Sequence, residues 1–160
     1  MTVGPGPITA SLTADHQAME PLILEAEKAL ASAVAGAAFT ALDRLWMRLA
    51  VHIRAEHKGV FPALGSARPD LMDELGTLRQ DHDFFMATLA VVVRGMESPA
   101  PDFAKAGAML EAVRTRLVSH NALEEGVIYM MADQLPPDAC GQVVEVIARE
   151  LAFLPGRYRS

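Results

Sequence analysis

Apolar residues recur at steps of three and four along most of the chain, which is the period of a helix buried on one side. Segments rich in Gly and Pro interrupt this period and divide the chain into successive helical stretches. No stretch alternates apolar and polar residues as a half-buried strand does. We therefore expect an all-α protein, with helices at residues of about 9–34, 40–64, 70–96, 102–135 and 138–153.

The connections between the predicted helices are short, and this favours antiparallel packing of neighbouring helices. The expected architecture is an up-down-up-down four-helix bundle with an additional short C-terminal helix. We expect residues 1–160 to form a single domain in which residues of about 9–135 make up the bundle. One side of the C-terminal helix can pack on this bundle through Val144, Ile147, Leu151 and Leu154.

The inward-facing stripe of each long helix contains a histidine among its apolar residues. In the second and fourth helices, a glutamate follows the histidine one turn later. The four stripes are Leu12, His16, Met19, Ile23, Ala26 and Leu30; Leu42, Leu45, Leu49, His52, Glu56 and Val60; Leu71, Leu75, Leu78, His82, Phe85, Leu89, Val92 and Met96; and Leu110, Val113, Leu117, His120, Glu124, Ile128, Met131 and Leu135.

The polar residues of these stripes need a partner inside the bundle. An unpaired carboxylate in an apolar core costs several kcal/mol, and a buried imidazole needs a hydrogen bond. Residues four apart lie one above the other on a helix, so a His-x-x-x-Glu pair can present N and O ligands to one centre. Three such pairs occur, counting His16 and Glu20, where chance predicts fewer than one. We therefore predict a shared site for a pair of divalent or trivalent metal ions, with His16, His52, Glu56, His82, His120 and Glu124 as ligands.

Composition and charge argue against several other functions. With 51% apolar and 21% charged residues, the chain is typical of a soluble globular protein. Its net charge of −6 and the lack of a Lys/Arg cluster argue against a nucleic-acid partner. The start MTVGPGPITASL does not have the pattern of a secretory signal, and the longest apolar run, Phe84–Val93, is too short to span a bilayer. We expect a cytoplasmic protein without a membrane partner, in which the single Cys140 forms no internal disulfide and is a packing residue.

The ordered motifs resemble those of the hemerythrin-like, or HHE cation-binding, proteins. The resemblance covers residues of about 9–135 and rests on DHQAME, HIRAEHKGVFPAL, RQDHDFF and HNALEEGVIYM. It implies a non-haem di-iron centre with two irons per chain, joined by an oxo or hydroxo bridge. The resemblance also implies that Glu56 and Glu124 bridge the irons and that the histidines cap them. Activities in this family include oxygen binding, reactions with nitric oxide or peroxide, iron sensing and repair of iron–sulfur clusters, and membership does not choose among them.

Two departures from the oxygen-carrying hemerythrins bear on activity. Those proteins have a fifth histidine where this chain has Met86, and an aspartate where it has Glu125. The pattern of this chain is more similar to the cluster-repair and iron-sensing branches. We therefore expect an open iron that reacts with or senses a small diatomic ligand or peroxide (O2, NO or H2O2), rather than one that carries oxygen reversibly. The alternatives are a protein for iron handling or iron–sulfur cluster repair, and a structural or interaction bundle that holds zinc or no metal. Zinc favours closed four-ligand sites, so the four histidines and two glutamates suit a pair of six-coordinate irons better.

The sequence leaves more than one role open for several residues near the predicted ligands. Glu20 either faces solvent or hydrogen-bonds a ligand, although metal binding is a third interpretation. We interpret His57, which replaces a glutamate common in the family, as partly exposed or as a neighbour of a ligand. Tyr129 and Trp46 are placed where they can lie near the centre. The sequence does not determine the redox partner or the oligomeric state.

Overall fold

Helices make up nearly all of the chain in the computed structural model, which describes residues 4–153. None of the described residues lies in a strand. The elements in chain order are α1 (Pro7–Ala31), α2 (Ala35–Ala55), η1 (Glu56–Val60), α3 (Phe61–Ala67), η2 (Pro69–Leu71), α4 (Met72–Gly95), α5 (Phe103–Leu123), η3 (Glu124–Ile128), α6 (Tyr129–Asp133) and α7 (Pro137–Ala152).

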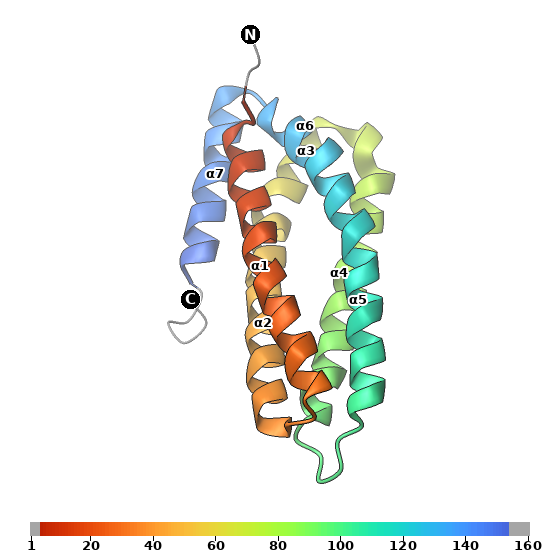
Figure 1. The fold of residues 1–160 in the computed structure, drawn as a ribbon. Coiled ribbons are helices and arrows are strands. Elements are labelled where there is room, and N and C mark those ends of the chain that lie inside the picture. The colour runs from red at the N-terminus through yellow and green to blue at the C-terminus, as the bar shows by residue number, and fades with distance from the viewer. Residues whose placement is uncertain (1–3, 154–160) are drawn as a thin grey trace.

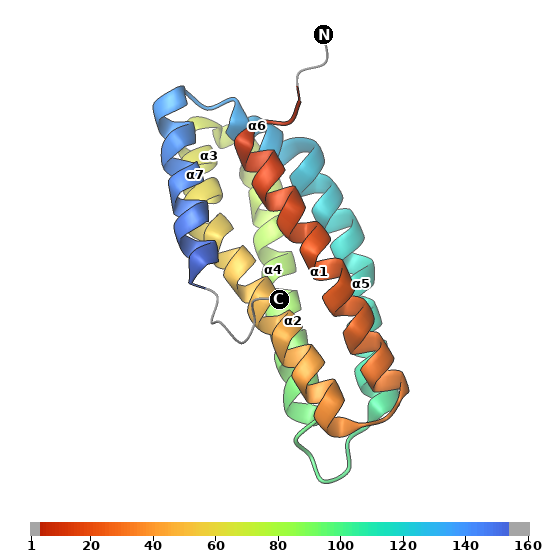
Figure 2. The same ribbon diagram turned by 60° about the vertical axis from the view of Figure 1, so that its left-hand side comes forward.

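The long helices pack side by side into a bundle, as Figure 1 shows. Helix α1 contacts α2 and α5, and α4 contacts the same two helices, so the four enclose a common core. Helices α3 and α6 continue the directions of α2 and α5 at the end where the N-terminus lies. The C-terminal helix α7 lies along the outside of α2, η1 and α1 (Figure 2). The prediction of an all-helical bundle is therefore confirmed.

Most predicted helix limits agree with the structure within a few residues. Helix α1 begins at Pro7, because proline suits the first turn of a helix, where its missing N–H has no partner to lose. The prediction for the second helix was less accurate, because the helix begins at Ala35 rather than near residue 40. Val34 is extended, and the alanines that follow it are strong helix formers, so the helix starts before the apolar stripe does.

Two π-helical turns interrupt the predicted second and fourth helices, and the periodicity gave no sign of them. Each turn begins at a glutamate of a His-x-x-x-Glu pair: η1 at Glu56 and η3 at Glu124. The backbone N–H of Phe61 donates to the carbonyl of Glu56, and that of Tyr129 donates to the carbonyl of Glu124. In an α-helix, residues five apart point about 140° away from each other, whereas an i→i+5 turn brings them toward the same side.

The core consists mainly of two large apolar clusters with a polar layer between them. The lower cluster, at the end of the α1–α2 connection, includes Leu45, Phe85 and Leu110, and the upper cluster includes Leu12 and Phe61. All predicted inward-facing residues of the four stripes are buried except Met131, which is partly exposed. On α7, Val143 is buried in place of Val144, Leu151 is partly exposed, and Leu154 lies outside the described residues. Among the described helices, none is long and apolar enough to cross a membrane.

Glu150 anchors α7 to the helix that carries two of the predicted ligands. Its carboxylate is buried, at 5% exposure, forms an ion pair with Arg54 Nε at 2.8 Å and accepts a hydrogen bond from Lys58 Nζ at 3.3 Å. Because Lys58 belongs to η1, this ion pair joins α7 to the π-turn that begins at Glu56. The outer helix therefore supports the wall of the polar layer.

Asp133, the last residue of α6, caps the start of α1 although the two segments are far apart in the sequence. Its Oδ1 accepts from the N–H of Ile8 at 2.8 Å, and its Oδ2 accepts from the hydroxyl of Thr9 at 2.6 Å. Gly6, at the N-cap, has no side chain to cap the helix, and a Cβ there would lie 2.3 Å from the Asp133 carboxyl carbon. The glycine thus lets a distant carboxylate replace a local cap.

We expect Asp133→Ala to lower the free energy of unfolding by about 1–2 kcal/mol, because it removes the cap of α1. Asp133→Asn should lose less, since the amide oxygen still accepts one bond. Urea unfolding measures both, with Gln134→Ala, at the exposed neighbouring position, as a control that should change little. An Asp133→Ala protein as stable as the control would show that the cap contributes nothing.

Candidate metal centre

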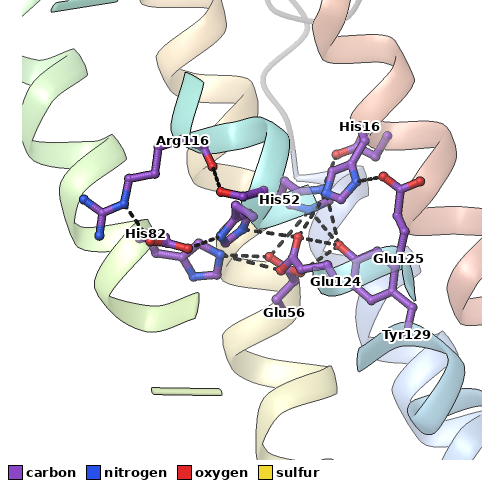
Figure 3. Close-up of polar contacts among 12 residues, drawn as sticks. His16, His52, Glu56, His82, Arg116, Glu124, Glu125 and Tyr129 are labelled. Atoms are coloured by element: carbon purple, nitrogen blue, oxygen red, sulfur yellow. Dashed lines mark hydrogen bonds and ion pairs between the residues drawn. The ribbon is translucent and has the colours of Figure 1, made fainter. Parts of the chain in front are cut away.

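The six predicted ligands meet in the polar layer between the two apolar clusters, although they come from distant parts of the sequence (Figure 3). All are buried, with exposures of 9% for His16, 1% for His52, 0% for Glu56, 2% for His82, 4% for His120 and 0% for Glu124. His16 lies on α1, His52 on α2, Glu56 on η1, His82 on α4, His120 on α5 and Glu124 on η3.

The four imidazoles point their Nε2 atoms toward the two carboxylates. Their ligand atoms form two groups, each with all atoms within 4.8 Å of one another: one of Glu56, His82, His120 and Glu124, and one of His16, His52 and Glu124. Glu124 Oε1 lies 3.1 Å from His16 Nε2 and 3.3 Å from His120 Nε2, and Glu56 Oε1 lies 3.2 Å from His82 Nε2 and 3.5 Å from His52 Nε2. Each glutamate therefore lies between a histidine of one group and a histidine of the other.

Three buried atoms at this point have no hydrogen-bond partner: Glu56 Oε1, His82 Nε2 and Glu124 Oε2. A buried polar group without a partner costs about 1–3 kcal/mol, and a charged one costs more. His82 Nε2 lies 3.2 Å from Glu56 Oε1 and 3.8 Å from Glu124 Oε2, so the three atoms surround a small space. A cation there would satisfy all three, and imidazole and carboxylate donors fit iron and similar metals.

Burial and mutual repulsion separate the two carboxylates in acidity. Burial, and then the charge of Glu124, raise the pKa of Glu56 well above its ordinary value. Burial also acts to raise the pKa of Glu124, but hydrogen bonds with Glu56, His120 and His16 outweigh it and hold this pKa well below the ordinary value. Without a metal, these shifts favour a proton shared by the pair, and a bound cation would displace it.

The imidazole of His82 is neutral at physiological pH. Burial lowers the pKa of His82 to about 4, and the nearby carboxylate of Glu124 raises it only in part. A neutral imidazole presents a lone pair for a metal, whereas a protonated one cannot bind. The unpartnered Nε2 atom of His82 is thus in the state that metal binding needs.

Two of the histidines are held from outside by an aspartate and an arginine. Such pairs fix the orientation of an imidazole and increase its basicity toward a metal. Burial alone would raise the pKa of Asp15, but its bonds with His52 and Arg48 lower it below the ordinary value. His52 Nδ1 lies 2.7 Å from Asp15 Oδ2, and Arg48 Nη2 lies 2.7 Å from Oδ1 of the same aspartate. On the other side, His120 Nδ1 lies 2.9 Å from Asp81 Oδ2, and Arg116 Nε lies 2.7 Å from Asp81 Oδ1.

The other two histidines have different outer partners. His16 Nδ1 lies 3.0 Å from Glu125 Oε2, so Glu125 supports this imidazole (Figure 3). His82 Nδ1 lies 2.8 Å from Nε2 of His57, an exposed residue, so this imidazole has a histidine where the others have carboxylates. The prediction that His57 neighbours a ligand agrees with this contact.

The centre contains an internal repeat, which explains the similarity of its two sides. Each copy begins with an Asp-His pair on one helix. The next long helix then carries an arginine, a histidine and a glutamate at intervals of four residues. The equivalent residues are Asp15 and Asp81, His16 and His82, Arg48 and Arg116, His52 and His120, and Glu56 and Glu124. This repeat was the available signal for the aspartates and arginines, which our sequence analysis did not identify.

Tyr129 lies within the centre itself, as Figure 3 shows. Its hydroxyl donates to Glu56 Oε2 at 2.8 Å or to Glu124 Oε1 at 2.9 Å. The same oxygen lies 3.2 Å from His16 Nε2 and 3.3 Å from His52 Nε2. Burial, and then the charges of Glu56 and Glu124, raise the pKa of Tyr129 well above its ordinary value.

The remaining residues considered from the sequence lie away from the centre. Glu20, which is exposed, pairs with Arg114 at 2.7 Å, in agreement with a solvent-facing position. Trp46 and Met86 pack against the lower apolar cluster, and Cys140 packs, partly exposed, against the upper one. A position for Trp46 at the centre is therefore not supported.

Comparison with known proteins agrees with the geometry. The family model for the hemerythrin HHE cation-binding domain matches residues 8–132. These residues include all four histidines and both glutamates of the buried cluster, together with Tyr129. Neither the curated proteins nor the solved structures gave a significant match. The family match covers well over half of the chain, and the chain therefore belongs to the hemerythrin HHE cation-binding domain family.

Proposed function

We propose that this protein holds two iron ions in its core and that the reduced centre reacts with a small molecule such as oxygen, nitric oxide or hydrogen peroxide. One observation supports the metal site above all others: the buried atoms Glu56 Oε1, His82 Nε2 and Glu124 Oε2 lie together without hydrogen-bond partners. In this proposal, His16 and His52 bind one ion, His82 and His120 bind the other, and Glu56 and Glu124 are shared between them.

The donor set favours a pair of irons over structural zinc. A structural zinc site uses four ligands and closes around one ion, whereas this centre offers four imidazoles and two carboxylates that can bridge. Two six-coordinate ions suit such a set better. With six protein ligands for two ions, coordination positions remain for a small molecule.

The proposal includes an up-down-up-down order of the four long helices within one domain of residues 1–160. The packing of α1 on α2 and α5, and of α4 on the same two helices, supports this order. The same pattern brings His16 and His52 to one side of the glutamates, and His82 and His120 to the other.

The surroundings of the centre suit a small neutral substrate. A cavity of about 140 Å³ between α1 and α5 reaches His16, and its lining includes the apolar Met19, Ile23, Leu117 and Val118 and the polar Glu20, Arg114 and Asn121. A small molecule can therefore approach the centre from the side of His16.

When bound, a pair of adjacent ferrous ions supplies two electrons to an oxidant. The protein residues hold and shield this pair. The Asp15 and Asp81 carboxylates fix two imidazoles, while Glu56 and Glu124 neutralise positive charge in the core. The apolar clusters on both sides exclude bulk water, which strengthens these electrostatic interactions.

Iron-loaded protein should contain two irons per chain, because the six ligands divide into two groups that share Glu124, and Glu56 lies within 3.5 Å of a histidine of each group. Metal analysis of protein purified from cells and of reconstituted protein measures this ratio. A ratio of one iron, or a preference for zinc in the purified protein, would contradict the proposal.

Stopped-flow mixing of the diferrous protein with oxygen, nitric oxide and hydrogen peroxide, each alone, then tests reactivity. Stable, reversible oxygen binding would contradict the proposed reaction, and inertness toward all three would indicate iron handling instead.

Substitution of the glutamates should separate ligands from supporting residues. We expect Glu56→Ala and Glu124→Ala each to lose most of the iron. Glu125→Ala should weaken iron binding by about 10–100-fold without abolishing it, because Glu125 contacts the outer nitrogen of His16. Competition with a chromogenic chelator measures the affinities, and Glu145→Ala, at an exposed position of α7, is the control. If Glu124→Ala kept its iron and Glu125→Ala lost it, the two roles would be exchanged.

Removal of the metal should lower the melting temperature by about 10 °C or more. Binding to the folded state alone adds about 4 kcal/mol when the metal is a thousandfold above its Kd, and 1 kcal/mol shifts the midpoint of a chain of this size by roughly 2–4 °C. Calorimetry of iron-loaded and chelated protein measures the shift. The Glu56→Ala/Glu124→Ala double variant should melt at one temperature with or without iron. Equal melting of the loaded and chelated wild type would show that the core holds no metal.

A further inference from the structure

Two of the differences between the two sides of the centre change a polar group. The residue after each glutamate is His57 on one side and Glu125 on the other. The residue nine positions after each histidine of a His-x-x-x-Glu pair is Phe61 on one side and Tyr129 on the other. The second difference places a single hydroxyl in a centre whose remaining inner donors are imidazoles and carboxylates.

The Tyr129 hydroxyl lies at ligand spacing from four proposed ligands. Donors around an octahedral ion at about 2.0–2.2 Å are about 2.8–3.1 Å from their neighbours. The Tyr129 oxygen lies 2.8 Å from Glu56 Oε2, 2.9 Å from Glu124 Oε1, 3.2 Å from His16 Nε2 and 3.3 Å from His52 Nε2. The two distances to carboxylate oxygens lie within this range, and the two to imidazole nitrogens exceed it by 0.1–0.2 Å, so the phenol oxygen lies close to a coordination position of the ion held by His16 and His52.

The π-turn η3 accounts for this position. In a continuous α-helix, Tyr129 would point about 140° away from Glu124, five residues earlier. The i→i+5 bond between their backbones brings both side chains to the same side of the helix. The backbone irregularity thus aims the phenol at the centre, where Tyr129 is fully buried at 0% exposure.

The equivalent turn η1 places an aromatic ring without oxygen on the other side. The Phe61 ring stacks on the His82 imidazole, with ring centroids 5.6 Å apart and planes 4° from parallel. Phe61 offers no donor atom, so the ion held by His82 and His120 has one protein ligand fewer. The two metal positions are therefore chemically different.

We infer that Tyr129 is a seventh ligand, binding the ion held by His16 and His52 through its phenolate oxygen, and that the ion held by His82 and His120 is the one open to small molecules. The inference rests on the proposed di-iron function. When the iron–oxygen bond forms, the phenolic O–H bond breaks and its proton leaves to solvent, with no change in the oxidation state of iron or tyrosine. The ligand class at the open ion is a small anion or diatomic molecule.

The visible spectrum of the diferric protein tests the ligand. A phenolate bound to ferric iron gives a charge-transfer band in the visible range, and excitation into this band enhances the tyrosinate vibrations in a resonance Raman spectrum. We expect both signals in the wild type and their loss in Tyr129→Phe, which keeps the ring and matches Phe61. Iron content is measured on the same samples, and Tyr129→Phe should keep two irons per chain with lower affinity at one of them. Tyr158→Phe, which removes the only other tyrosine of the sequence, should keep both signals.

Titration of the diferric protein with sodium azide tests the open position. We expect one azide per chain in the wild type and two in Tyr129→Phe, because the variant frees a position on the second ion. Wild-type protein with two irons and no tyrosinate signal, or with signals that survive in Tyr129→Phe, would overturn this inference and leave the di-iron function intact. Two azides per chain in the wild type would overturn the assignment of the open ion. A protein that takes up no iron would overturn both the inference and the proposed function.

Discussion

Two carboxylates buried side by side set the conditions for the rest of this structure. Glu56 and Glu124 are completely shielded from water, and each repels the charge of the other. Such a pair is stable only if protons, imidazoles or cations neutralise it. The protein supplies four imidazoles and a phenol within hydrogen-bonding range, and the HHE family match supplies the independent indication that a cation belongs there.

The neutralising groups are themselves held in place by a second layer that reaches the surface. Aspartate–arginine pairs hold two imidazoles, and Glu125 and His57 hold the other two. Because these contacts join α1 to α2, α4 to α5, α1 to η3 and α4 to η1, they connect the helices around the whole bundle. The centre therefore orders the same helices that position it, and the apolar clusters above and below keep it dry.

Periodicity alone was sufficient to predict the helices, the buried stripes and the six polar residues that meet in the core. These predictions succeeded because a buried face repeats every three to four residues, whatever its polarity. The same reasoning missed Asp15 and Asp81, which lie beside the stripe and act through a neighbouring helix. It also assigned Glu125 no contact with the centre, because the position of this residue depends on the π-turn that begins at Glu124. Contacts between helices and irregular backbone turns are set by tertiary packing, which spacing along one helix cannot reveal.

The two π-turns also divide each ligand-bearing helix into two segments whose rotation is set independently. A π-turn contains one residue more than the α-helical turn it replaces. Loss of a single residue from η1 or η3 would restore a regular helix and rotate everything after it by about 100°. The histidine before the turn and the glutamate at its start would keep their places, while Phe61 or Tyr129 would leave the centre. A single-residue deletion at one of these turns would therefore change the aromatic residue at the centre and keep the histidine and glutamate ligands.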